Sequence, residues 1–83
     1  MDKTYVRVLA EFSEDGAITP VRLYWEGVPF DIDRVLDVRP AASLKHGGQG
    51  DRYTIRIRGQ IRYLFLERGV ITEGLGRWFV ETP

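Results

Sequence analysis

The chain has 83 residues, no cysteine, and twelve basic side chains against twelve acidic ones, so its net charge is zero. This length allows one small domain, residues 1–83, and not two. The lack of cysteine excludes a disulfide framework, a thiolate metal site and a thiol nucleophile. The zero net charge excludes a generally basic nucleic-acid-binding protein.

Met1–Thr4 leads directly into an alternating pattern, without the apolar stretch that a secretory signal needs. No apolar stretch along the chain is long enough to span a bilayer. Together with the absence of cysteine, this predicts a cytoplasmic protein that does not contact membranes.

Apolar and polar residues alternate over the first part of the chain, which predicts β-strands. The Asp15-Gly16 pair predicts a two-residue hairpin turn, with Val8 opposite Leu23 and Ala10 opposite Val21 on the core side. The first two strands are predicted over residues 4–12 and 18–26.

A second turn, at Glu26-Gly27, predicts that a strand over 28–38 folds back beside the strand before it. Arg22 would then form an exposed cross-strand ion pair with Asp31. Arg34 interrupts the apolar alternation, so we expect a bulge or a sharp bend near it. A long strand that bends is what the closure of a small barrel requires.

Residues 40–50 break the strand pattern. Pro40 can begin a short helix over 40–46, and a structured loop fits equally well. The glycine-rich run that follows could bind an anion through backbone N–H groups, although a plain connection between strands is the favoured interpretation. The residues of this weak anion-binding loop are Lys45, Gly47, Gly48 and Gly50.

Strand alternation returns after residue 50. Gly59-Gln60 predicts a type II′ turn between strands 52–58 and 61–68, and a last strand covers 76–81. In the register that this turn sets, Tyr53 lies opposite Leu66. The fold class predicted is all-β: a single small domain of about six antiparallel strands, a meander plus a hairpin, closing into a partly open barrel or roll.

The hairpin 52–68 carries five arginines and one acid. Its polar face also displays two aromatic rings. Proteins bind single-stranded nucleic acid with such residues, because an arginine guanidinium neutralises a phosphate while an aromatic side chain stacks on a base. This predicts a non-enzymatic module that contacts single-stranded nucleic acid. The binding residues would be Arg52, Arg56, Arg58, Tyr63 and Phe65.

Structural interpretations of the same residues stay open. In the predicted register Arg56 forms a cation–π pair with Tyr63, and Arg52 forms an ion pair with Glu67. The arginines could also be neutralised by the acids of the first strands. Residues 1–38 carry four basic and eight acidic groups, a net charge of −4, and residues 39–83 carry eight and four, a net charge of +4.

The alternative function is a protein-interaction or self-assembly domain, a monomer or weak homodimer that uses exposed apolar surface or a free strand edge. Trp25 and Trp78 are expected in the core. The alternation then turns Phe79 to the other side of its strand, where an exposed ring near Tyr24, Phe65 or Leu9 would form an apolar patch.

No catalytic residue, metal site or cofactor is predicted. The single histidine, His46, has no catalytic motif around it. Asp31, Asp33 and Asp37 share one side of a strand, but nearby arginines can neutralise them and no calcium-loop spacing is present.

Three segments resemble a group of small bacterial proteins of unknown function. They are a tryptophan–glycine turn followed by a "VLD" strand (25–37), an arginine–tyrosine strand (52–55) and a closing "RWFVE" strand (77–81). The resemblance implies a bacterial, cytoplasmic, stand-alone all-β domain, and it implies no activity.

Overall fold

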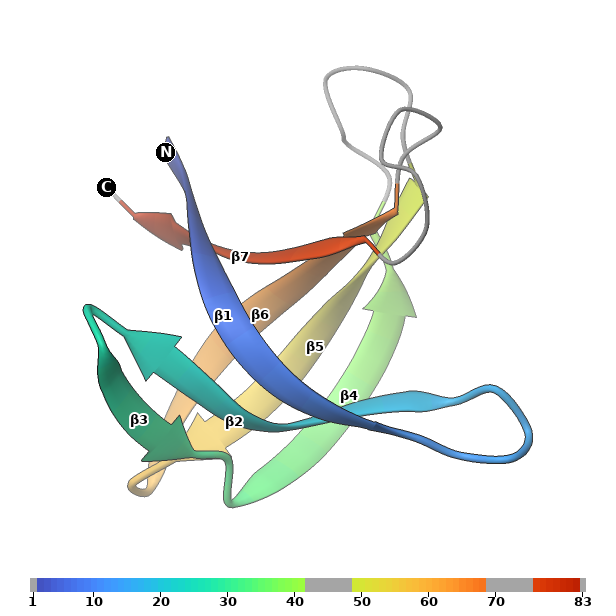
Figure 1. Cartoon of the computed structure of the whole chain (residues 1–83), viewed down its shortest axis with the longest axis horizontal. Coiled ribbons are helices and arrows are strands. Elements are labelled where there is room, and N and C mark those ends of the chain that lie inside the picture. The colour runs from blue at the N-terminus through green and yellow to red at the C-terminus, as the bar shows by residue number, and fades with distance from the viewer. Residues whose placement is uncertain (1, 42–48, 69–75, 83) are drawn as a thin grey trace.

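A computed structural model describes residues 2–41, 49–68 and 76–82. Seven antiparallel strands form one sheet in the order β3-β2-β1-β7-β6-β5-β4 (Figure 1). The predicted all-β class is confirmed. The strands are β1 (Asp2–Phe12), β2 (Ile18–Trp25), β3 (Val28–Asp31), β4 (Arg34–Pro40), β5 (Gln49–Ile57), β6 (Gln60–Arg68) and β7 (Arg77–Thr82).

The sheet curls back on itself into a half-barrel. In Figure 1, β1, β2 and β3 lie in front of β4, β5 and β6, with β7 between the two groups. The corner between β3 and β4 connects both layers: Ile32 N–H donates to Val21 C=O (3.0 Å), and Asp33 N–H donates to Arg56 C=O (2.8 Å). This corner divides the predicted strand 28–38 in two, so the sheet has seven strands rather than six.

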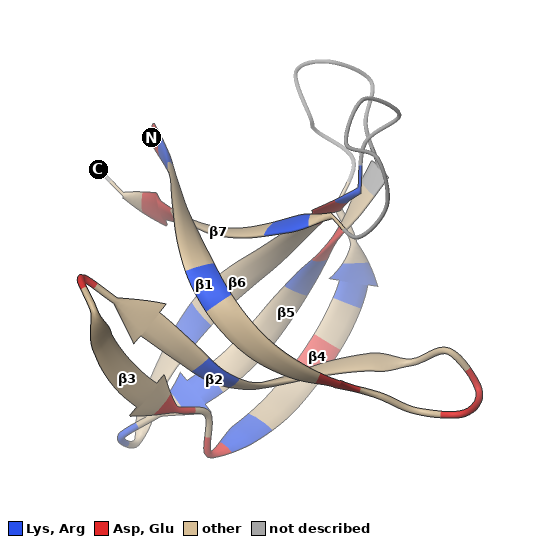
Figure 2. Ribbon diagram, in the orientation of Figure 1, with Lys and Arg blue, Asp and Glu red and all other residues tan. Residues whose placement is uncertain are grey.

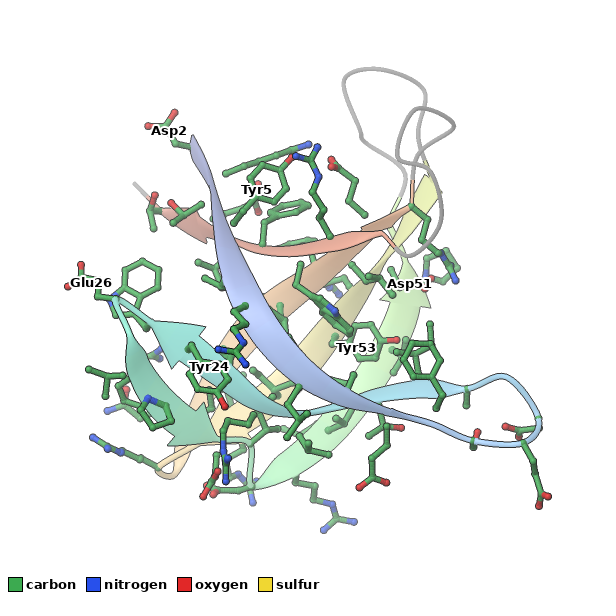
Figure 3. All side chains as sticks on the ribbon, viewed as in Figure 1. Asp2, Tyr5, Tyr24, Glu26, Asp51 and Tyr53 are labelled. Atoms are coloured by element: carbon green, nitrogen blue, oxygen red, sulfur yellow. The ribbon has the colours of Figure 1, made fainter. Side chains whose placement is uncertain are left out.

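The inner face of the curled sheet holds the core. Tyr53 reaches from the back layer toward the front one (Figure 3), where its hydroxyl donates to Ile18 C=O at 2.8 Å. Burial raises the pKa of this phenol. Trp25 and Trp78 pack against the cluster, as predicted. The buried residues of the cluster are Leu23, Tyr53, Ile55, Leu64 and Leu66.

The turn between β5 and β6 differs from the predicted one. It consists of Arg58 (φ 50°) and Gly59 (φ 76°), the positive-φ pair of a type I′ turn, rather than Gly59-Gln60. The register therefore moves by two residues, and Tyr53 pairs with Leu64 instead of Leu66. Because a shift of two keeps every side chain on the same face, the predicted faces of this hairpin are correct.

The Asp15-Gly16 turn is longer than predicted. Asp15 accepts the Ala17 N–H (3.1 Å) inside a loop that Ser13 and Ala17 close through a backbone hydrogen bond (2.9 Å). A register shift after Leu9 then places Ala10 opposite Pro20 rather than Val21. The pairing of Val8 with Leu23 and of Arg22 with Asp31 is confirmed.

Pro40 does not begin a helix. It is the last residue of β4 and lies opposite Asp51 of β5. Ala41 N–H then donates to Gly50 C=O at 2.9 Å, which extends the contact between these strands by one residue. The rest of the predicted helix, 42–46, lies outside the described residues.

Candidate nucleic-acid interface

The outer face of β4, β5 and β6 gathers arginines and aromatic residues. Residues directly opposite one another in a sheet share a face, so the register defines this surface. In Figure 2 the basic bands of β4 and β5 lie in the back layer. We call it the arginine–aromatic face; its residues are Arg34, Asp37 and Arg39 of β4, Arg52, Thr54 and Arg56 of β5, and Ile61, Tyr63 and Phe65 of β6.

Two pairs of arginines lie directly opposite each other on this face. Arg34 faces Arg56, and Arg39 faces Arg52. Like charges in directly opposed positions destabilise a sheet. Asp37 offsets one pair, because its carboxylate accepts from Arg39 Nε at 2.7 Å. Within the described residues, Arg34 and Arg56 form no ion pair.

Arg52 joins the basic and aromatic parts of the face. It lies opposite Phe65, and its guanidinium carbon is 5.1 Å from the centre of the Tyr63 ring. Its Nε is buried and has no hydrogen-bond partner among the described residues. The Tyr63 side chain is 52% exposed, so part of its ring stays open to a ligand. Arg52, Arg56, Tyr63 and Phe65 are thus brought together as predicted.

Glu67 does not pair with Arg52, contrary to the predicted register. Its side chain, 12% exposed, accepts from Lys3 Nζ (2.7 Å), the Tyr5 hydroxyl (2.9 Å) and Arg77 (3.3 Å). The Lys3 hydrogen bond is the main reason that the pKa of Glu67 is below its ordinary value. The acid therefore joins β6 to β1 and β7, and Arg52 is left without a carboxylate among the described residues.

Phe79 is buried, which corrects its expected exposure. Phe65 stacks on it with ring centres 4.9 Å apart, Tyr5 meets it edge-on at 5.9 Å, and only 3% of Phe79 is exposed. Figure 3 shows Tyr5 beside β7. The physical reason is that β7 lies between β1 and β6, so residues of both neighbours cover its outer side. The predicted apolar patch therefore does not include Phe79.

Arg58 lies apart from the other predicted binding residues. It occupies the β5–β6 turn, and its guanidinium carbon is 4.6 Å from the centre of the Phe30 ring. It lines an apolar groove of about 780 Å³ between β6 and the front layer, to which Tyr63 and Phe65 also contribute. These two rings therefore border both the arginine–aromatic face and the groove.

The remaining candidate positions have structural partners or lie outside the described residues. Gly50 is buried in β5 opposite Glu67, while Lys45, Gly47, Gly48 and His46 lie outside. Asp31 pairs with Arg22 at 2.7 Å. In the part of the chain that the structure describes, no three acidic or histidine side chains are grouped closely enough to hold a metal ion.

Arg34 and Arg39 were not predicted as part of the site. They belong to the site only because β4 pairs with β5. Residues 41–48 separate these two strands in the sequence, and no turn motif there predicts the pairing. The one signal in the sequence was Arg34 itself, since a charge that interrupts apolar alternation marks a change of face.

Comparison with protein families, curated proteins and solved structures finds no match for this chain. The resemblance to a small bacterial group therefore stays a prediction. Across the described ranges there is no helix long and apolar enough to cross a membrane.

Proposed function

We propose that this protein is a non-enzymatic module that binds single-stranded nucleic acid on the arginine–aromatic face. The observation that carries the proposal is the presence of two pairs of opposed arginines, Arg34 with Arg56 and Arg39 with Arg52. Their repulsion weakens the sheet in the free protein. A phosphate backbone lying across them would replace that repulsion with attraction and would release its counterions.

The aromatic residues favour a single strand over a duplex. Tyr63 and Ile61 are 52% and 54% exposed beside the arginines, and base faces are accessible for stacking only where the bases are unpaired. Arg52 supports the Tyr63 ring from one side, which limits its rotamers before a base arrives. The absence of cysteine and the resemblance to small bacterial proteins support a bacterial cytoplasm as the setting that we propose.

The test is a fluorescence titration of labelled single-stranded and duplex oligonucleotides at low salt. We expect preferential binding of the single strand, with an affinity that decreases steeply as salt is added. Arg56→Gln should reduce the slope of log K against log salt by about 0.7, the value for one phosphate contact on a single strand. Tyr63→Leu should cost about 1–3 kcal/mol of binding free energy.

The matched control is Arg7→Gln. Like Arg56, Arg7 is exposed and forms no ion pair among the described residues, but it belongs to β1 in the front layer, where its guanidinium carbon is 4.8 Å from the ring centre of Tyr24. Its removal should leave the salt slope nearly unchanged. Equal effects of the two arginine substitutions, or no binding below about 100 µM at low salt, would contradict the proposal.

A further inference from the structure

The sheet is split between β6 and β7. Their pairing begins at Glu67 with Arg77 and ends at Phe65 with Phe79. Beyond this point β5 still pairs with residues 60–64 of β6, and β1 still pairs with residues 80–82 of β7. Figure 1 shows the two strands running apart from their shared end. Among the described strands, residues 60–64 therefore have a neighbour on one side only.

The hairpin geometry shows which backbone groups point into this split. Ile57 and Gln60 flank a two-residue turn, so they exchange hydrogen bonds with each other. Alternate residues of a strand direct their backbone groups to opposite sides, and the N–H and C=O groups of Ile61 and Tyr63 therefore point toward β7. Since β7 has diverged there, β6 presents an edge without a strand partner among the described residues, of the kind that templates another strand. Arg62 Nη1 donates to the Ile61 C=O at 3.0 Å, so an incoming strand would displace this guanidinium from the edge.

An apolar groove adjoins this edge. It has a volume of about 780 Å³, within the range of ligand pockets. Core residues of both layers line it, including Leu23, Trp25, Phe30 and Ile55, and Tyr63 and Val80 border it where the strands separate. An apolar side chain entering the split would therefore meet the core cluster.

We propose that the split binds an extended peptide of a partner protein by strand addition at Ile61–Tyr63. One apolar side chain of the peptide would enter the groove, and a carboxylate two residues along, on the same side of the peptide strand, would meet Arg58 and Arg62, which line the same groove. Glu81 is the single acid among the lining residues, so the groove carries a net positive charge that suits an acidic, apolar segment.

The geometry favours a single peptide strand over a second copy of this chain. The unpaired edge lies between two strands of one sheet, so the edge of a folded domain would meet β7 before it could pair. Antiparallel pairing of β6 with its own copy about this segment would also bring Arg62 close to its counterpart. Like charges at such positions are unfavourable.

The test uses a short capped peptide with the pattern Val-Thr-Glu-Thr-Val, in which valine and glutamate share one side of the strand. It is titrated into isotopically labelled protein and followed by NMR. We expect the amide signals of Ile61, Tyr63 and Glu81 to shift, and hydrogen exchange at Ile61 and Tyr63 to slow. A peptide with lysine in place of glutamate should bind more weakly, and one methylated on alternate backbone nitrogens should not bind. Shifts confined to β4 and β5, or equal binding of the methylated peptide, would overturn the proposal.

Two proline variants test the edge itself. Ile61→Pro removes an N–H that points into the split, so the fold should persist while peptide affinity decreases about two- to tenfold, as for one lost hydrogen bond. Arg62→Pro is the matched control: its N–H points to β5, so the fold should be destabilised. Unchanged peptide affinity in a folded Ile61→Pro protein would overturn the proposal. The oligonucleotide titration of the arginine–aromatic face does not depend on either result.

Discussion

Two strand pairs on opposite layers of the half-barrel differ in the residue that lies opposite an arginine. In the front layer Arg22 of β2 lies opposite Asp31 of β3, and the two form an ion pair at 2.7 Å. In the back layer Arg34 of β4 lies opposite Arg56 of β5, and no described carboxylate forms an ion pair with either arginine. The front pair is satisfied within the sheet, whereas the back pair carries a repulsion that an anionic ligand can relieve.

The contrast also explains what a net charge of zero conceals. Four arginines of residues 39–83 lie outside the arginine–aromatic face, and two of them have acids: Arg68 pairs with Asp51 at 2.6 Å and Arg77 with Glu67 at 3.3 Å. Asp37 is the single acid among the residues of that face; Glu67, two residues after Phe65 on the same side of β6, is already held by Lys3, Tyr5 and Arg77. Acids therefore neutralise Arg68 and Arg77 outside the arginine–aromatic face, whereas most of the arginines on that face keep a positive charge that no described acid compensates.

Among substitutions that test this contrast, we expect the largest loss of stability at Glu67, which has more side-chain hydrogen-bond partners than any other described carboxylate. Glu67→Gln keeps the shape of the side chain but removes the charge that holds Lys3, Tyr5 and Arg77. We expect the free energy of unfolding in urea to decrease by about 1–3 kcal/mol, because only 12% of the Glu67 side chain is exposed and three donors would lose a charged acceptor. Asp31→Asn is the control: Asp31 is 73% exposed, so its loss should change the unfolding midpoint much less. Equal midpoint shifts would contradict the difference between the two sites.

The pH dependence of stability should follow the same group. Because the Lys3 hydrogen bond lowers the folded-state pKa of Glu67 below its ordinary 4.5, the carboxylate stabilises the fold fully above that pH. The stabilisation is then lost progressively as the pH falls from about 4.5 through the folded-state value. Urea midpoints of the natural protein and of Glu67→Gln should therefore converge in acid. Parallel curves from neutral to acid pH would contradict this assignment.

Local signals predicted the elements of the fold but not the way in which they meet. The Glu26-Gly27 turn set the β2–β3 register correctly, since both residues take the positive φ that the turn needs. At the β5–β6 turn two adjacent pairs contained Gly59, and the chain uses the one with glycine second. Alternation alone could not place β7 between β1 and β6, and that placement is what buries Phe79 on the outer side of its strand.

The sequence predicted the residues that β5 and β6 contribute to the arginine–aromatic face, but it did not predict those of β4. Arg52, Arg56, Tyr63 and Phe65 share a face in both the predicted and the observed register, because the two differ by an even number of residues. The arginines of β4 were missed, since they meet β5 through a long-range pairing that includes a register shift between Val35 and Asp37. The broken alternation at Arg34 predicted an irregularity close to this point, and the observed shift confirms it, but the alternation did not show which strand β4 pairs with.

The smallest expected change in stability comes from exchanging the two kinds of cross-strand pair, arginine opposite an acid and arginine opposite arginine. Arg56→Glu places a carboxylate opposite Arg34, as Asp31 lies opposite Arg22, and should raise the free energy of unfolding by about 0.2–1 kcal/mol while weakening oligonucleotide binding. Asp31→Arg creates the opposite change in the front layer and should lower the unfolding midpoint. Both shifts should shrink in high salt, since screening reduces attraction and repulsion between exposed charges alike. A destabilised Arg56→Glu protein would show that the opposed arginines are not under strain, and the argument for an anionic ligand on this face would then lose its main support.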